Sequence, residues 1–197
     1  MKKNFYDVAI IGSGIIGSSI AYFLAANPDF KGSVLLIEKN PAYTNSSTAL
    51  SLGGIRQQFS VAENIEISKF GIEFIKNSGD LLAVNGDVPN VYFTEIGYLF
   101  LATEKGIETL QQNYNLQKKH NVSVLMLSKN ELKSKFPWLT VDDLMGGCYG
   151  FQNEGFLDPY LLLKAFINKS KSLGVDFIKD EVVAIKNIVK YIFPFSI

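Results

Sequence analysis

Three glycines near the N-terminus have a spacing that suits the binding of a diphosphate. Gly12, Gly14 and Gly17 form the pattern Gly-x-Gly-x-x-Gly. In this pattern the first glycine allows a tight turn, the second lets the backbone approach a pyrophosphate, and the third lets a helix pack close to a sheet. The helix N-terminus also offers free N–H groups and the positive end of its dipole to phosphates. The glycines therefore predict a dinucleotide site, provided that a strand precedes them and a helix follows.

The flanking residues meet that condition. Residues 8–11 are a short apolar run, typical of a buried parallel strand, and a helix should follow Gly14 and end at Asn27-Pro28. A second apolar strand over residues 34–37 ends in Glu38, 21 residues after Gly17. An acidic residue at this spacing typically binds ribose hydroxyls, which disfavours NADP with its 2′-phosphate. The alternative is an ordinary strand–turn–helix with a solvated glutamate.

Periodicity and turn signals predict the elements beyond this unit. Capping boxes at Ser60–Glu63 and Ser128–Glu131 should each begin a helix, and Asp158-Pro159 should begin another that ends at Leu173-Gly174. The apolar faces of the first two helices are expected to contain Ile16, Ile20, Phe23 and Leu24 (beside the small residues Gly17 and Ala21), and Ile67, Phe70, Gly71, Phe74 and Ile75. Further strands are expected at residues 91–93, 97–102, 122–127, 146–151, 175–178 and 182–185.

The last helix and strands should return the chain to the nucleotide sheet, beside the first two strands. The predicted fold is therefore α/β, with a Rossmann-like βαβ domain and an inserted α+β domain. The expected division is residues 1–80 and 156–190 for the nucleotide domain, 81–155 for the inserted domain, and 191–197 for an irregular apolar tail. The tail resembles the end of a truncated reading frame. An open half-sheet would leave an unpaired strand edge through which the chain could associate.

Composition excludes several classes of function. The formal net charge is zero, which leaves no electrostatic footprint for nucleic acid or an anionic membrane. No apolar run reaches the length of a membrane span, and the first strand begins too early for a signal peptide. The single cysteine, Cys148, excludes an internal disulfide and is consistent with a reducing, cytoplasmic location. The single histidine, His120, sits at an expected helix end, so neither a transition-metal site nor a Ser-His-Asp arrangement is expected.

The loop after the second strand is the remaining candidate for a binding segment. Small and hydroxyl residues at 46–51 lead into Gly53-Gly54, a composition that suits backbone held close to something flat or phosphorylated, or simply a loop. Arg56 and Gln57 follow directly. With the glycine motif, residues 46–60 resemble the D-amino-acid oxidase/sarcosine oxidase-like (DAO) family of FAD-dependent oxidoreductases. Residues 97–102 and 153–159 continue this resemblance, which extends to about residue 185.

The resemblance implies a GR2-type FAD domain, a partial substrate domain, and oxidation of the C–N bond of an amino acid or N-methylated amino acid. Family members are much longer, and their C-terminal half supplies further sheet, substrate domain and flavin-facing residues. The resemblance also implies that Arg56 lies near the flavin and binds the carboxylate of a small amine substrate, with Gln57 in the same pocket. The electron acceptor stays open, and FAD should be held non-covalently. The implied FAD-binding residues are Gly12, Ser13, Gly14, Ile15, Ile16, Gly17, Glu38, Lys39, Ser46, Ser47, Thr48, Gly53 and Gly54.

Two other functions stay open. The chain could be a non-catalytic flavin-binding or assembly-type protein, or an NAD-dependent dehydrogenase, which the glycine motif alone permits. The dehydrogenase lacks a visible acid or base for the nicotinamide, and the Arg56 loop fits FAD better.

Overall fold

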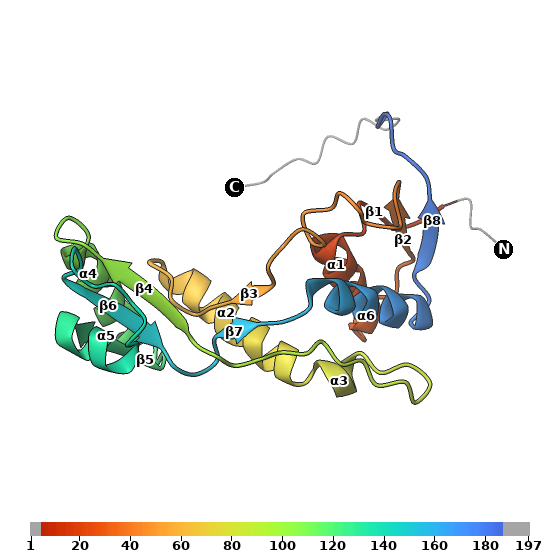
Figure 1. Cartoon of the computed structure of the whole chain (residues 1–197). Coiled ribbons are helices and arrows are strands. Elements are labelled where there is room, and N and C mark those ends of the chain that lie inside the picture. The colour runs from red at the N-terminus through yellow and green to blue at the C-terminus, as the bar shows by residue number, and fades with distance from the viewer. Residues whose placement is uncertain (1–4, 187–197) are drawn as a thin grey trace, which may run out of the picture.

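The computed structural model describes residues 5–186, so the predicted tail at 191–197 lies outside the described residues (Figure 1). The elements, in chain order, are β1 (Val8–Ile11), α1 (Ile15–Ala26), β2 (Val34–Glu38), β3 (Gly54–Ile55), α2 (Ala62–Lys76), α3 (Ser78–Leu81), β4 (Tyr98–Ala102), α4 (Ile107–Lys119), β5 (Val124–Ser128), α5 (Lys129–Lys135), β6 (Gly146–Gly150), β7 (Gly155–Phe156), α6 (Pro159–Ser172) and β8 (Asp176–Lys179).

A parallel sheet in the order β1-β2-β8 forms the nucleotide side of the molecule. Val8 pairs with Val34, and Leu35 pairs with Asp176, so the last described strand lies beside the second. Helices α1 and α6 lie side by side against this sheet, and the core beneath α1 includes Ala21 and Leu36. The predicted βαβ unit and the late return to its sheet are confirmed. The predicted strand at 182–185 is wrong, because residues 181–186 form no strand.

A second, antiparallel sheet in the order β4-β6-β5 lies at the other end of the molecule, with α4 and α5 packed on it (Figure 1). Helix α2 and the short β3-β7 ladder lie between the two sheets. The predicted strand at 91–93 is wrong: Tyr92 has φ +52°, which interrupts an extended chain, and only Thr94 bridges to Phe156.

Helix ends agree with the sequence where a side chain can cap them. The Ser128 side chain accepts from the Glu131 N–H and the Glu131 side chain accepts from the Ser128 N–H, as the capping box predicts. Asp158 caps α6 by accepting from the N–H groups of Tyr160 and Leu161. The box at Ser60 is wrong, because α2 begins one residue later with Val61 as its N-cap and no side-chain cap. Glu63 then stands one position too early in the helix to complete a box.

The packed faces of α1 and α2 differ from those predicted. Helix α1 buries Gly17, Ser18, Ala21 and Tyr22, whereas Ile16 is 75% exposed. Ile20, Phe23, Ile67 and Phe70 are also exposed. The small residues let α1 approach its neighbours closely, and Tyr22 is the large side chain that α1 buries. The predictions for Leu24, Phe74 and Ile75 hold, since these residues pack against or within the core clusters.

Candidate functional site

In the glycine turn, the backbone geometry favours glycine at positions 12 and 17, whereas position 14 has room for a side chain. Gly12 has φ +91°, and its N–H donates to the Ile37 carbonyl at 2.8 Å. A Cβ on Gly17 would lie 1.9 Å from the Gly12 carbonyl oxygen, so α1 requires glycine there. A Cβ on Gly14 would meet only the Thr48 Oγ1, at 3.4 Å. Packing does not demand glycine at 14, and its missing side chain leaves a cradle at the N-cap of α1.

A cleft of about 610 Å³ lies between this turn and the loop after β2. Thr48 joins the two walls, because its Oγ1 accepts from the Ile15 N–H at 3.0 Å. A cleft with a helix N-terminus at one wall and hydroxyl side chains at the other fits a diphosphate. Ten of the predicted FAD-binding residues line it: Gly12, Gly14, Ile15, Ile16, Gly17, Ser46, Ser47, Thr48, Gly53 and Gly54.

Glu38 lies at the carboxyl end of β2 and is fixed by its neighbours. Its Oε2 accepts from the Ser13 N–H at 2.9 Å, and its Oε1 accepts from the Asn40 N–H at 2.8 Å. Ser13 is fully buried and also hydrogen-bonds the hydroxyl of Tyr43, whose pKa is raised by burial. Glu38 and Lys39 line a separate cavity of about 330 Å³ beside Gly12. Glu38, the predicted ribose-binding residue, therefore borders a space next to the glycine turn, and the hydrogen bond from Ser13 holds its carboxylate in place.

Arg56 follows β3 and lies among aromatic rings. Its guanidinium carbon is 4.9 Å from the ring centre of Phe59, 5.3 Å from that of Phe100 and 5.9 Å from that of Tyr98. It borders a cavity of about 530 Å³, and Gly54 and Ile55 line both this cavity and the glycine cleft. The predicted cofactor and substrate sites are thus neighbours across β3.

Gln57 is not brought to the Arg56 cavity. Its side chain is buried and lines a different, polar cavity with residues of α2, including Lys69 and Lys76. Adjacent side chains of an extended chain point to opposite sides, which separates Gln57 from Arg56.

Glu154 is the residue that sequence reasoning missed. It is fully buried, and its Oε1 accepts from the N–H groups of Gln57 at 2.5 Å and Gln58 at 3.0 Å. Its Oε2 accepts from the Gln58 Nε2 at 2.8 Å. Burial raises the pKa of Glu154, while these hydrogen bonds and the charge of Arg56 oppose the rise. Residues 153–155 have loop composition, so only the long-range contacts show that this acid is internal.

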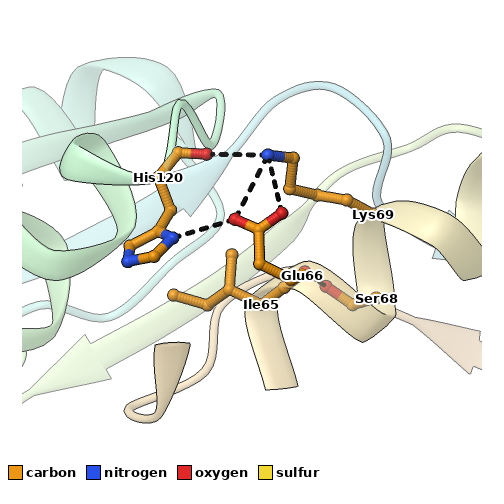
Figure 2. Close-up of polar contacts among 5 residues, drawn as sticks. All are labelled: Ile65, Glu66, Ser68, Lys69 and His120. Atoms are coloured by element: carbon orange, nitrogen blue, oxygen red, sulfur yellow. Dashed lines mark hydrogen bonds and ion pairs between the residues drawn. The ribbon is translucent and has the colours of Figure 1, made fainter. Parts of the chain in front are cut away.

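Two further titratable side chains, His120 and Cys148, lie outside the glycine cleft and the Arg56 cavity. His120 is the C-cap of α4, and its Nδ1 is 2.8 Å from the Glu66 Oε1, while Lys69 pairs with the same carboxylate (Figure 2). Cys148 is buried in β6 and is free. Among residues 5–186, no group of three acidic, histidine or cysteine side chains could hold a metal ion.

Comparison with known proteins decides the family. The model of the DAO family, described as FAD dependent oxidoreductase, matches residues 7–192. The chain belongs to this family. It is 43% identical over 172 residues to FAD-dependent oxidoreductase domain-containing protein 1 of Xenopus laevis and 27% identical over 184 residues to glycine oxidase of Bacillus subtilis. These alignments cover 86% and 88% of this chain, but 34% and 45% of the two relatives.

Solved structures agree with the fold. L-proline dehydrogenase from P. horikoshii superposes with a TM-score of 0.73 at 28% identity, covering 87% of this chain and 43% of that protein. The chain thus spans between a third and a half of the length of these three proteins. The family's cofactor is FAD, as the resemblance implied. In the described part of the chain, no helix has the length and apolar character needed to cross a bilayer.

Proposed function

We propose that this chain provides the FAD site and the carboxylate anchor of an oxidoreductase that oxidises the C–N bond of an amino acid or N-methylated amino acid. The observation that carries the proposal is the junction at β3, where the glycine cleft and the Arg56 cavity share Gly54 and Ile55. A cofactor in the first would lie next to a substrate in the second.

The glycine cleft supplies the cofactor site. Gly14 and the N-terminus of α1 would hold the pyrophosphate, and Glu38 would accept from the ribose hydroxyls. FAD, when bound, supplies the acceptor for the hydride that leaves the carbon next to the substrate nitrogen. Gly53 and Gly54 let the chain pass close to that cofactor. A Cβ on Gly53 would lie 2.1 Å from the Leu157 carbonyl oxygen, so this loop packs tightly on the segment before α6.

Arg56 supplies the substrate anchor. Among residues 5–186, no carboxylate lies within ion-pair distance of its guanidinium, which leaves the fork available for a ligand. An arginine binds a carboxylate with two parallel hydrogen bonds and so orients the neighbouring α-carbon. The rings of Phe59, Tyr98 and Phe100 hold the guanidinium by cation–π contacts.

The charge of the cavity favours an amine that binds uncharged. Its lining contains Arg56, two small polar side chains (Asn64 and Ser68) and no acidic residue. An ammonium group would find no counter-ion there, whereas a neutral amine keeps the lone pair that C–N oxidation needs. Relatives named glycine oxidase and dimethylglycine dehydrogenase also support an amino acid or N-methylated amino acid as substrate.

The test is an absorbance spectrum of the purified 197-residue chain before and after incubation with FAD and gel filtration. Retained flavin bands are expected, with a Gly14→Ala variant binding at least about tenfold more weakly because the methyl group fills the cradle. Gly106→Ala is the matched control, since its Cβ would meet only ordinary contacts outside the cleft. Absence of flavin binding, or NAD binding in its place, would contradict the proposal. Flavin binding without turnover of any N-methyl amino acid would favour the non-catalytic alternative.

We also propose that the chain divides into a nucleotide part (residues 1–80 and 156–190) and an inserted part (81–155).

In addition, we propose that the surface formed by β1 and the exposed side of α1 associates with a second copy of the chain. β1 is an outer strand of the described sheet, and Ile16, Ile20 and Phe23 are exposed on α1 beside it. Sedimentation should show self-association that Phe23→Lys, outside the glycine cleft, reduces and Val183→Lys, a control at a residue that is 89% exposed, leaves unchanged. A monomeric wild type would contradict the association. The cytoplasmic location stays a prediction from the single free cysteine.

A further inference from the structure

We propose that Glu154 is a positioning residue that fixes the direction of the Arg56 guanidinium. This inference rests on the proposed function of Arg56 as the carboxylate anchor. Glu154 does not line the Arg56 cavity. It acts through the backbone and side chain of the two residues that follow Arg56.

The first contact is to the backbone directly after the anchor. The Glu154 Oε1 accepts from two successive N–H groups, those of Gln57 at 2.5 Å and Gln58 at 3.0 Å. These two bonds hold the chain in one orientation just where it leaves Arg56. The loop follows a ladder of only two residue pairs, β3 with β7, so regular structure alone does little to fix it.

The second contact joins the loop to the wall of the Arg56 cavity. The Gln58 Nε2 donates to the Glu154 Oε2 at 2.8 Å and to the Tyr98 carbonyl at 2.9 Å. Tyr98 belongs to β4, and its ring is one of the three that surround the guanidinium. Glu154 thus connects the backbone that carries Arg56 to the strand that carries part of its aromatic surroundings.

In the second sheet, a glycine in β6 leaves room for the Glu154 carboxylate. A Cβ on Gly150 in β6 would lie only 1.8 Å from the Glu154 Oε2, so no residue with a side chain fits there while the carboxylate is in place. Gly150 pairs with Tyr98, which puts the space left by the missing side chain beside the same strand.

The chemistry of the contacts requires a carboxylate. Three N–H donors converge on its two oxygens, and a carboxylate accepts at both. A glutamine at 154 would accept the backbone N–H groups through its oxygen but would turn its NH₂ group against the NH₂ group of Gln58. Buried donors that face each other are costly, so the Gln58 link should break, and the backbone bonds should weaken because an amide oxygen is a poorer acceptor than a carboxylate.

The experiment compares Glu154→Gln with the swapped double variant Glu154→Gln/Gln58→Glu, in which the new carboxylate at 58 accepts from the new amide at 154. Amide hydrogen exchange of Gln57 and Gln58 reports the loop without any ligand. Isothermal titration with benzoate, an aromatic carboxylate, reports the anchor, with uncharged benzamide as the control ligand. Arg56→Met tests the anchor itself. Glu104→Gln is the control variant, since Glu104 is an exposed acid in the turn that precedes α4.

We expect slow exchange at both backbone amides in the wild type and at least about tenfold faster exchange at the Gln58 amide in Glu154→Gln, because the neutral oxygen of glutamine is a weaker acceptor than a carboxylate. Benzoate affinity should fall about tenfold in Glu154→Gln, which is about 1.4 kcal/mol. The double variant should recover part of this loss, because a carboxylate at 58 accepts from the amide at 154 but cannot donate to the Tyr98 carbonyl. A general packing defect would not be recovered by the swap. If Glu154→Gln does not fold, Gln58→Met, which removes the side-chain link and keeps the backbone bonds, should still weaken benzoate binding several-fold.

Two results overturn the inference. One is fast exchange at Gln57 and Gln58 in the wild type. The other is a folded Glu154→Gln chain that binds benzoate as the wild type does, while Arg56→Met does not bind it. Benzoate binding that survives Arg56→Met, or that is absent from the wild type, contradicts the proposed anchor instead, and amide exchange then still decides whether Glu154 orders the loop.

Discussion

Gly17 of α1 lies directly against the carbonyl oxygen of Gly12 in the turn that precedes the helix, since a Cβ on Gly17 would be 1.9 Å from that oxygen. A Gly17→Ala substitution must therefore move the helix away from the turn. Overpacking of this kind should lower the free energy of unfolding by roughly 2–3 kcal/mol. Urea denaturation should show this loss, and Gly106→Ala, which meets only ordinary contacts at the N-cap of α4, should cost at most about 1 kcal/mol. Equal stability of the two variants would contradict the close approach of α1.

The two sequence-predicted capping boxes give a matched pair of substitutions. Ser128→Ala removes a side-chain acceptor for the Glu131 N–H at the start of α5 and should cost about 1 kcal/mol. Ser60→Ala should cost much less, because Val61 and not Ser60 is the N-cap of α2. Thermal denaturation of both variants checks this. A larger loss for Ser60→Ala than for Ser128→Ala would show that α2 begins earlier than described.

The contact between α2 and the end of α4 should depend on pH. Hydrogen bonds from His120 and Lys69 lower the pKa of Glu66 (Figure 2). At pH values between the lowered pKa and the ordinary pKa of Glu66, the unfolded chain therefore binds more protons than the folded chain. The contribution of Glu66 is therefore present above its ordinary pKa and is lost as the pH falls through the lowered one.

Glu66→Gln should make the free energy of unfolding fall less steeply over roughly pH 5 to 3. Glu73→Gln, on the exposed side of the same helix, is the control and should leave the slope unchanged. Urea titrations at several pH values measure the slope. An unaltered slope in Glu66→Gln would mean that the contact contributes no pH dependence.

Cys148 should be unreactive in the folded chain. Burial, with the nearby charge of Glu154, raises the pKa of its thiol to about 12, so almost no thiolate is present at pH 8. A colorimetric thiol reagent should react at least about a hundredfold more slowly with the native chain than with the chain in urea, because the thiolate is the nucleophile. Fast reaction of the native chain would show that β6 opens readily. The inert thiol also argues against covalent attachment of a cofactor at this position.

The sequence by itself determined the parts of the fold that depend on near neighbours. The β1–α1–β2 unit follows from apolar runs, glycines and an Asn-Pro stop within residues 8–38, and the start of α6 follows from Asp158-Pro159. Such signals act over one helical turn or one strand, so composition and spacing reveal them. The family resemblance, which these and the following motifs carry, implied ten of the residues that line the glycine cleft.

Only the tertiary structure decided which side chains are enclosed and what they contact. Glu154 and Gln58 are 96 residues apart in sequence, and nothing near Glu154 marks it as internal. In the tertiary structure, Gln57 also lines a different cavity from Arg56. On α1, Gly17 is buried and Ile16 is exposed. Burial depends on which distant segments pack together, and the hydrophobic effect acts on area removed from water by any neighbour. A periodic apolar pattern therefore predicts a helix but does not specify the surface against which that helix packs.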